Sequence, residues 1–237
     1  MTEPDPAAAH GAKHGRDELQ RVWTETDRLV GSGTCYTVFG LGLAYLPATV
    51  AGLVDSGLDA PIRDPYLAIM ELLIIPLAIG LVVAFAAVHS YAPHPTRTLS
   101  LGALVLVGMS AGMTIGVHSV VLTVGRHPQL AALPGAALLF SWTWPSVVYA
   151  LDIAAWDLCL GAALLLAAPV FAPGPRSGPV RRGLVVSGVL CLAGLLGVLL
   201  NNMNVRNIGI VGYAVVLPIV MLLMGRLFAD TRPTTES

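Results

Sequence analysis

Charged side chains are scarce in this sequence. They make up 11% of its 237 residues, whereas a soluble domain typically carries about 25%. Lys13 is the single lysine, and the net charge is −1. Because a nucleic-acid-binding protein needs a basic surface, we expect no nucleic-acid partner.

Cysteine is also sparse, and no recurring catalytic motif occurs in its required context. Cys35, Cys159 and Cys191 stand alone in apolar segments, so we expect them to pack and to bind no metal. The pattern H-E-x-x-H, the P-loop and the Rossmann glycine motif do not occur. G-x-S-x-G occurs once, at residues 108–112, but inside an apolar stretch and not at the strand-to-helix turn that the esterase motif requires. The sequence therefore disfavours metalloproteases, esterases, nucleotide-driven pumps and dinucleotide enzymes, and it predicts no cofactor.

Apolar residues are abundant, at 55% of the chain. Six apolar stretches reach or approach the roughly 20 residues that cross a bilayer as a helix. They are residues 35–54, 65–90, 99–124, 145–171, 183–200 and 207–228. We predict an all-α polytopic membrane protein with six transmembrane helices. Residues 32–229 form its membrane domain, and residues 1–31 and 230–237 are cytoplasmic.

Two further segments are apolar in part. Residues 16–30 carry apolar side chains on one helical face, which predicts an amphipathic interfacial helix on the inner membrane surface. A cytoplasmic cap helix packed on the protein is the alternative. Residues 129–141 are too short to span and predict a re-entrant or interfacial segment. Asp64 is expected to cap the second span, with Pro65 at its first position.

The distribution of positive charge predicts the orientation. With the N-terminus inside, ten lysines and arginines lie on the inner side, and only Arg63, Arg126 and Arg206 lie outside. Positive residues concentrate in cytoplasmic loops. We therefore expect a multi-pass protein of the inner (plasma) membrane with both termini in the cytoplasm.

The third predicted span carries small residues at regular spacing. Gly108, Gly112 and Gly116 lie four residues apart on one helical face. Such a face allows a neighbouring helix backbone to come close. We expect a tight contact within the chain, or alternatively a homo-oligomer interface.

Ionisable residues within the spans give the main functional signal. A charged side chain near the bilayer centre costs at least ~2.5–3.5 kcal/mol, so it is placed there sparingly. Glu71, His118 and Asp152 lie roughly 9–11 Å from the outer ends of their helices at 1.5 Å per residue. Asp157 lies deeper, at about 18 Å by the same rise. We predict a catalytic site formed by these four side chains.

Other residues are candidates for binding a substrate near this site. In an α-helix Asp157 points about 140° away from Asp152, so the two should not face one point. The remaining candidates lie one turn from Asp152 or at the outer end of the fifth span, where asparagines could equally cap the helix. They are Tyr149, Trp156, Asn201, Asn202 and Arg206.

The second half of the chain also resembles a known group of proteins. The segments PSVVYALD (145–152), LLAAPVF (165–171) and VRNIGIVGY (205–213) carry the likeness. They resemble an uncharacterised family of six-span bacterial membrane proteins. The resemblance implies the six-helix fold, and it supplies no catalytic residue.

The predicted function follows from the shared depth of the ionisable residues. We expect an outward-facing polar pocket that binds a lipophilic small molecule, with membrane lipid around it. Acid–base chemistry of the isomerase or cyclase type is expected there. A proton-coupled transporter or exporter subunit is one alternative. An accessory or structural membrane protein, with polar residues that only join helices, is the other.

Overall fold

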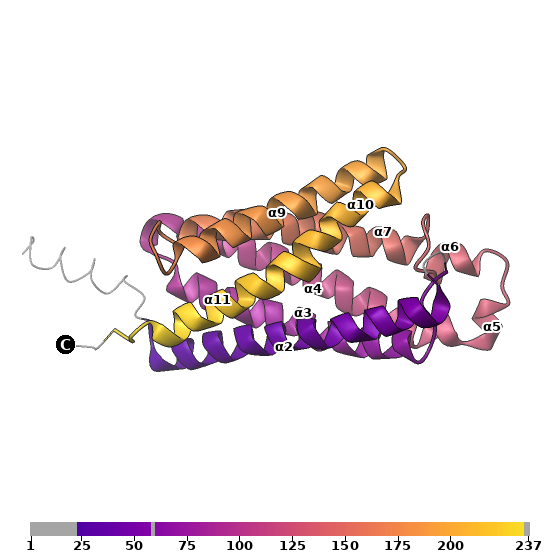
Figure 1. Ribbon diagram of the computed structural model, residues 1–237, viewed down its shortest axis with the longest axis horizontal. Helices are drawn as coiled ribbons and strands as arrows, with labels where there is room; N and C mark the ends of the chain where they lie inside the picture. Colours follow the sequence, from indigo (N-terminus) through magenta and orange to yellow (C-terminus); the bar gives the residue numbers. More distant parts are fainter. Residues whose placement is uncertain (1–22, 58–59, 235–237) are drawn as a thin grey trace, which may run out of the picture.

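The computed structural model describes residues 23–57 and 60–234, and this part of the chain is helical with connecting turns (Figure 1). Six helical segments of the described residues are long and apolar enough to cross a membrane, which confirms the predicted fold class. The first three contain α2 (Glu25–Ser56), α3 (Tyr66–Tyr91) and α4 (Arg97–Leu122). The fourth joins α7 (Val147–Ile153), η3 (Ala154–Leu160), α8 (Gly161–Ala167) and η4 (Ala168–Val170). The fifth is α9 (Gly178–Leu199), and the sixth joins α10 (Met203–Ile210), η5 (Val211–Val216) and α11 (Leu217–Asp230).

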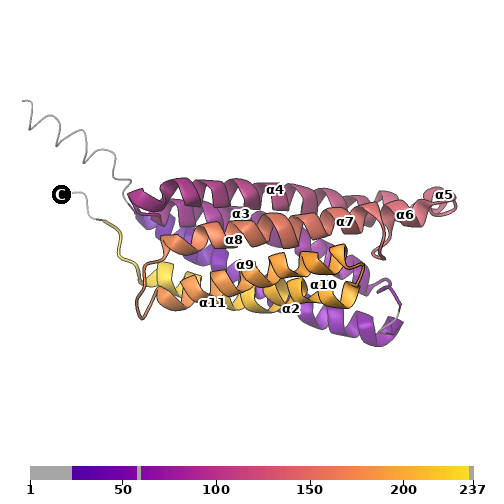
Figure 2. The ribbon, with the colours of Figure 1, turned by 90° about the horizontal axis from the view of Figure 1, so that it is seen from above.

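The six spans pack as a closed ring in chain order, and α11 returns to contact α2. Figures 1 and 2 show the long helices running side by side. The ends of the described chain meet, because the Thr234 N–H donates to the Trp23 carbonyl oxygen at 2.9 Å. Both ends of the described chain therefore lie at the same end of the bundle. We call the opposite end of the bundle the distal end.

The first span begins earlier than expected. The Thr24 hydroxyl accepts a hydrogen bond from the Asp27 N–H at 3.1 Å, and the Asp27 carboxylate accepts from the Thr24 N–H at 3.0 Å. This reciprocal cap starts α2 at Glu25. Residues 25–30, expected in a separate interfacial helix, are thus the first turns of the span. Residues 16–22 of that predicted helix lie outside the described residues.

An aromatic cluster closes the end of the bundle near the termini. Trp23 is buried and packs on the rings of Tyr91 and Phe228, with centroids 5.4 and 5.3 Å away. Phe171 stacks on Tyr91 from the fourth span. Side chains from four parts of the chain therefore fill this end.

The distal end is covered by the connection between α4 and α7. It contains a 3₁₀ turn, η2 (Val124–Arg126), and two short α-helices, α5 (Pro128–Ala131) and α6 (Ala136–Phe140). Figures 1 and 2 show α5 and α6 extending past the end of the bundle. Leu133 and Leu138 are 55% and 60% exposed. Residues 129–141 therefore do not re-enter the bundle, and their place at the membrane interface stays a prediction.

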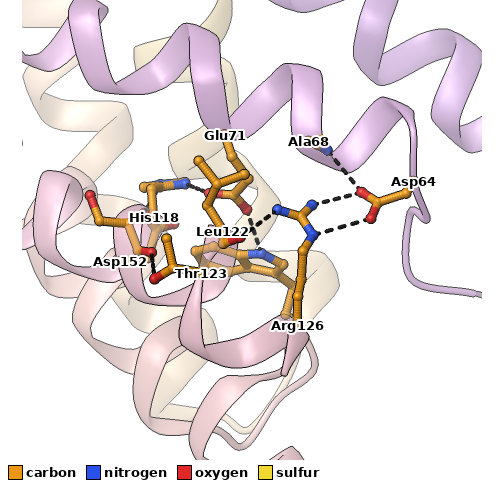
Figure 3. A network of polar contacts seen from close by, with 10 residues as sticks. Asp64, Ala68, Glu71, His118, Leu122, Thr123, Arg126 and Asp152 are labelled. Atoms are coloured by element: carbon orange, nitrogen blue, oxygen red, sulfur yellow. Dashed lines mark hydrogen bonds and ion pairs between the residues drawn. The ribbon is translucent and has the colours of Figure 1, made fainter. Parts of the chain in front are cut away.

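The second span starts one residue later than predicted. Helix α3 begins at Tyr66, and Pro65 is its first flanking residue. The Asp64 carboxylate still accepts a hydrogen bond from the Ala68 N–H at 3.1 Å. It also pairs with Arg126 at the end of the third span, at 2.6 Å (Figure 3). The prediction of Asp64 as the N-cap was wrong by one residue, because Pro65 is the N-cap; the Asp64 carboxylate still binds a first-turn N–H of α3 and links this end to Arg126.

The glycine face of α4 does not form the predicted contact within the chain. A Cβ atom placed on Gly108, Gly112 or Gly116 would meet nothing within 4 Å. The other side of α4, with Ala103 and Val107 fully or nearly buried, faces the bundle instead. The expectation of a tight intrachain contact was wrong. A homo-oligomer interface through these glycines stays a prediction.

The close contact between backbones lies elsewhere, between α9 and α10. A Cβ on Gly194 would stand 2.9 Å from the Gly209 Cα, and one on Gly197 would overlap the Arg206 backbone. We expect Gly197→Ala to destabilise the protein by about 3 kcal/mol, because backbone atoms cannot move aside as a flexible side chain does. Gly112→Ala is the matched control and should be neutral or stabilising by up to about 1 kcal/mol, since alanine favours helix. Unfolding both variants in detergent tests this, and equal stabilities would contradict it.

Candidate functional site

A buried carboxylate on α3 begins a line of polar contacts across the distal half of the bundle. Glu71 is 1% exposed although it lies on a membrane span. Its Oε1 accepts a hydrogen bond from Trp142 Nε1 at 2.9 Å, and its Oε2 lies 2.5 Å from His118 Nδ1 (Figure 3). A carboxylate only accepts, so the Nδ1 atom of His118 carries a hydrogen. Glu71 therefore fixes both the orientation and the tautomer of His118.

His118 is the second group in the line. It comes from α4, is 6% exposed, and has the Trp142 ring 5.0 Å from its own centroid. Its other nitrogen, Nε2, lies 3.4 Å from Oδ1 of Asp152 on α7. Neither of these two buried atoms has a hydrogen-bond partner. The structure thus brings Glu71, His118 and Asp152 together as the sequence predicted, and it leaves a polar edge of the imidazole unsatisfied.

Arg206 occupies a different place from the one expected. We predicted it at the outer surface, but it is 2% exposed inside the bundle. Helix α10 begins at Met203, capped by the Asn202 side chain, so Arg206 lies one turn inside the span. Its Nη2 lies 3.9 Å from Asp152 Oδ2, and its Nε lies 3.2 Å from Asp157 Oδ2. Because Gly197 has no side chain, the backbone of α10 can come close enough to α9 for this burial.

Asp157 also departs from its predicted direction. Residues Ala154–Leu160 form a π-helix, in which hydrogen bonds join residues five apart. Asp152 and Asp157 are separated by that interval, so the wider turn brings both toward Arg206 where an α-helix would have turned them apart. Asp157 is completely buried. The expectation that the two carboxylates face different points was wrong, because it assumed α-helical geometry.

Aromatic rings surround the arginine. The Arg206 guanidinium carbon lies 5.2 Å from the centre of the Tyr149 ring and 5.8 Å from that of Tyr213. Trp156 packs on Tyr213, with centroids 5.1 Å apart. The predicted residues Tyr149 and Trp156 therefore join the site. Tyr213 was missed, although its position seven residues after Arg206 places it on the same helical face.

The two asparagines remain at the periphery. Asn202 caps α10 by accepting hydrogen bonds from the N–H groups of Asn204 and Val205. Asn201 has a positive φ of 50° and accepts a hydrogen bond from Trp144 Nε1 at 3.0 Å. Both side chains are exposed. They form the turn between α9 and α10, and the structure does not bring them to the ionisable cluster.

An apolar cavity of about 100 Å³ adjoins the line of polar contacts. It lies between α2, α3 and the η5–α11 segment, and His118 and Asp152 form part of its wall. The other polar or aromatic wall groups are Tyr45, Trp156 and Tyr213, and the rest of the lining is aliphatic. Leu46 on this wall is 41% exposed, so this part of the wall lies at the outer surface of the bundle. We call it the lateral side of the cavity. Tyr45 was not predicted, because the sequence does not say which face of α2 turns inward.

The titratable side chains in and around the cavity are one imidazole, carboxyl groups and tyrosines. Within the described part of the chain, no group of three or more His, Cys, Asp or Glu side chains is arranged to hold a metal ion. Cys35, Cys159 and Cys191 are buried and unbridged. The imidazole and the carboxyl groups are therefore the reactive groups that line or adjoin the cavity.

Comparison with known proteins adds no further assignment. No protein family, curated protein or solved structure matches this chain. The resemblance of residues 145–152, 165–171 and 205–213 to six-span bacterial proteins stays a prediction. The function has to be inferred from the side chains that meet in the distal half of the bundle.

Proposed function

We propose that this protein binds a lipophilic small molecule in the apolar cavity and that His118 moves a proton on it. One observation carries the proposal. The Nε2 atom of His118 is buried and has no hydrogen-bond partner, and His118 lines the cavity while its Nδ1 atom is held by Glu71. Buried polar atoms are nearly always satisfied, and exceptions concentrate at functional sites.

A carboxylate behind an imidazole supports a role in acid–base catalysis. It holds the tautomer whose outer nitrogen can accept a proton, and it stabilises the imidazolium that then forms. Trp142 donates to the other oxygen of Glu71 and packs on the imidazole, so it is a positioning residue. Glu71 and Trp142 together favour one orientation of the reactive edge of His118.

The reaction class that fits is a proton shift. His118 Nε2 would take a proton from one carbon of the substrate and return it to another carbon, and the double bond between them moves. The same group then acts as base and acid, and no oxidant or reductant is consumed. Isomerisation of a lipophilic substrate has this balance. Cyclisation balances when a proton adds to one carbon, a double bond is converted into the new ring bond, and a proton leaves another carbon. Asp152 Oδ1 lies 3.4 Å from Nε2, so Asp152 is the neighbouring group able to hold the proton between its removal and its return.

The membrane orientation is part of the proposal. We propose that both termini are cytoplasmic and that the distal end faces outward across the plasma membrane. Since Arg206 is buried within a span, the predicted outer surface retains only Arg63 and Arg126, against ten basic residues on the other side. The positive-inside rule therefore favours this orientation more strongly than the sequence alone did.

The two alternatives have less support. In a proton-coupled transporter the relay Glu71–His118–Asp152 would have to continue through Arg206, and a guanidinium does not give up its proton in proteins. A purely structural network would be expected to satisfy its buried atoms. His118 Nε2 and Asp152 Oδ1 have no such partners.

Deuterium incorporation tests the proposal while the substrate is still unidentified. The purified protein is reconstituted with a total lipid extract of its host in D₂O, and the lipid-soluble compounds are followed by mass spectrometry. A proton shift at carbon exchanges the moving proton with solvent, so one compound class should gain mass with time. Protein-free vesicles are the control. If no compound gains deuterium above that control, the acid–base proposal fails.

A further inference from the structure

The cavity wall presents two hydrogen-bond acceptors that have no donor. With its hydrogen on Nδ1, His118 carries a lone pair on Nε2, and this atom faces Asp152 Oδ1 at 3.4 Å. Neither atom has a hydrogen-bond partner, and His118 is more than nine-tenths buried. Two adjacent acceptors repel each other unless a donor lies between them. Since the proposed function keeps His118 Nε2 for the substrate carbon, the complementary polar group of the ligand is one that donates to Asp152.

The charges of the buried cluster point to the sign of that ligand group. Glu71, Asp152 and Asp157 supply three negative charges, and Arg206 supplies one positive charge. Even if His118 is protonated, one negative charge remains. Asp157 and Glu71 have close partners at 3.2 and 2.5 Å, whereas Asp152 lies 3.4 Å from His118 Nε2 and 3.9 Å from Arg206 Nη2. Of the three carboxylates, Asp152 therefore has the longest contacts with the positive or proton-bearing groups, and it lines the cavity.

Aromatic side chains on the same wall suit a cation. Tyr45, Trp156 and Tyr213 line the cavity beside Asp152. The face of an aromatic ring attracts a nearby cation, and the attraction strengthens where water is excluded. Tyr213 already has the Arg206 guanidinium 5.8 Å from its centre. The other lining residues are aliphatic, so the body of the ligand should be apolar.

We propose that the cavity binds a lipophilic amine in its ammonium form, with the ammonium donating to Asp152, which leaves His118 Nε2 free to act on a substrate carbon. This inference rests on the proposed function, because it names the substrate class of the same cavity. The ammonium supplies Asp152 with a hydrogen-bond donor and with a positive charge at close range. Its hydrocarbon part lies along the wall formed by Ile74, Leu77 and Leu217, toward the lateral side marked by Leu46.

A matched pair of probes tests the charge preference. The pair is 4-fluorobenzylamine and 4-fluorobenzyl alcohol, which have nearly the same shape, and binding to the reconstituted protein is followed by fluorine NMR. We expect the amine to bind at least about tenfold tighter, which corresponds to one charge-assisted contact. In Asp152→Asn the preference should fall to within about twofold. Asp64→Asn, which removes a carboxylate paired at the distal surface, should keep it.

A second variant guards against a folding defect in Asp152→Asn. Tyr45→Leu keeps an apolar wall and removes one ring, so it should weaken the amine several-fold more than the alcohol. If the alcohol binds as well as the amine to the wild-type protein, the amine proposal is overturned and ligand binding by the cavity still stands. If neither probe binds, both the amine proposal and the ligand-binding cavity are overturned.

Discussion

His118→Gln should lower the rate of deuterium incorporation by about 10²–10⁴-fold, which is the usual contribution of a positioned acid–base group. Glutamine keeps a polar side chain of similar reach, but its amide neither takes nor gives a proton near neutral pH. Because His118 faces the cavity and Glu71 fixes its other nitrogen, no neighbouring group can replace it in the same position. The measurement is the initial rate of mass gain in the compound that the wild-type protein labels.

The control for this variant is a second histidine with a part-buried contact. His89 lies at the end of α3 near the termini, and its Nδ1 is 2.8 Å from the Ser100 hydroxyl. His89→Gln makes the same chemical change far from the cavity, so its rate should stay within about twofold of wild type. A His118→Gln variant that folds and keeps the wild-type rate would remove His118 from the mechanism.

Arg206→Met is expected to destabilise the protein by about 3–5 kcal/mol, because it leaves buried carboxylates without their cation. Methionine fills much of the same volume as arginine, so the loss of stability reflects the missing charge more than missing packing contacts. Asp157 is completely buried, and Arg206 Nε is its ion-pair partner at 3.2 Å. The free energy of unfolding in detergent, compared between variant and wild type, measures the effect.

The double variant separates charge from shape. Arg206→Met combined with Asp157→Leu removes both charges of the closest pair, and replacing a buried pair by apolar residues is often neutral or stabilising. We therefore expect the double variant to be more stable than Arg206→Met alone. A loss under about 1 kcal/mol in the single variant, or additive losses in the double variant, would show that the pair does not interact as the distances indicate.

Long apolar stretches determined the fold class, because a bilayer accepts only segments whose backbone groups are satisfied internally. Six such stretches, with both ends on one side, were predictable from length and hydrophobicity alone. The meeting of Glu71, His118 and Asp152 was also predictable, because equal depth in adjacent helices leaves few other arrangements. The start of the first span at Glu25 was missed, since a capping box between Thr24 and Asp27 extended the helix beyond its apolar core.

The rest of the cluster was decided by tertiary structure. Depth along a helix can be counted in the sequence, but direction around it depends on local hydrogen bonding. The π-helix over Ala154–Leu160 turned Asp157 toward Arg206. The contact between α9 and α10 at Gly197 carried Arg206 into the bundle, while the evenly spaced glycines of α4 faced outward. Sequence alone determined that there are six spans and placed Glu71, His118 and Asp152 at similar depth, because apolar length and helical rise can be counted; only the packing of the helices decided which side chains touch.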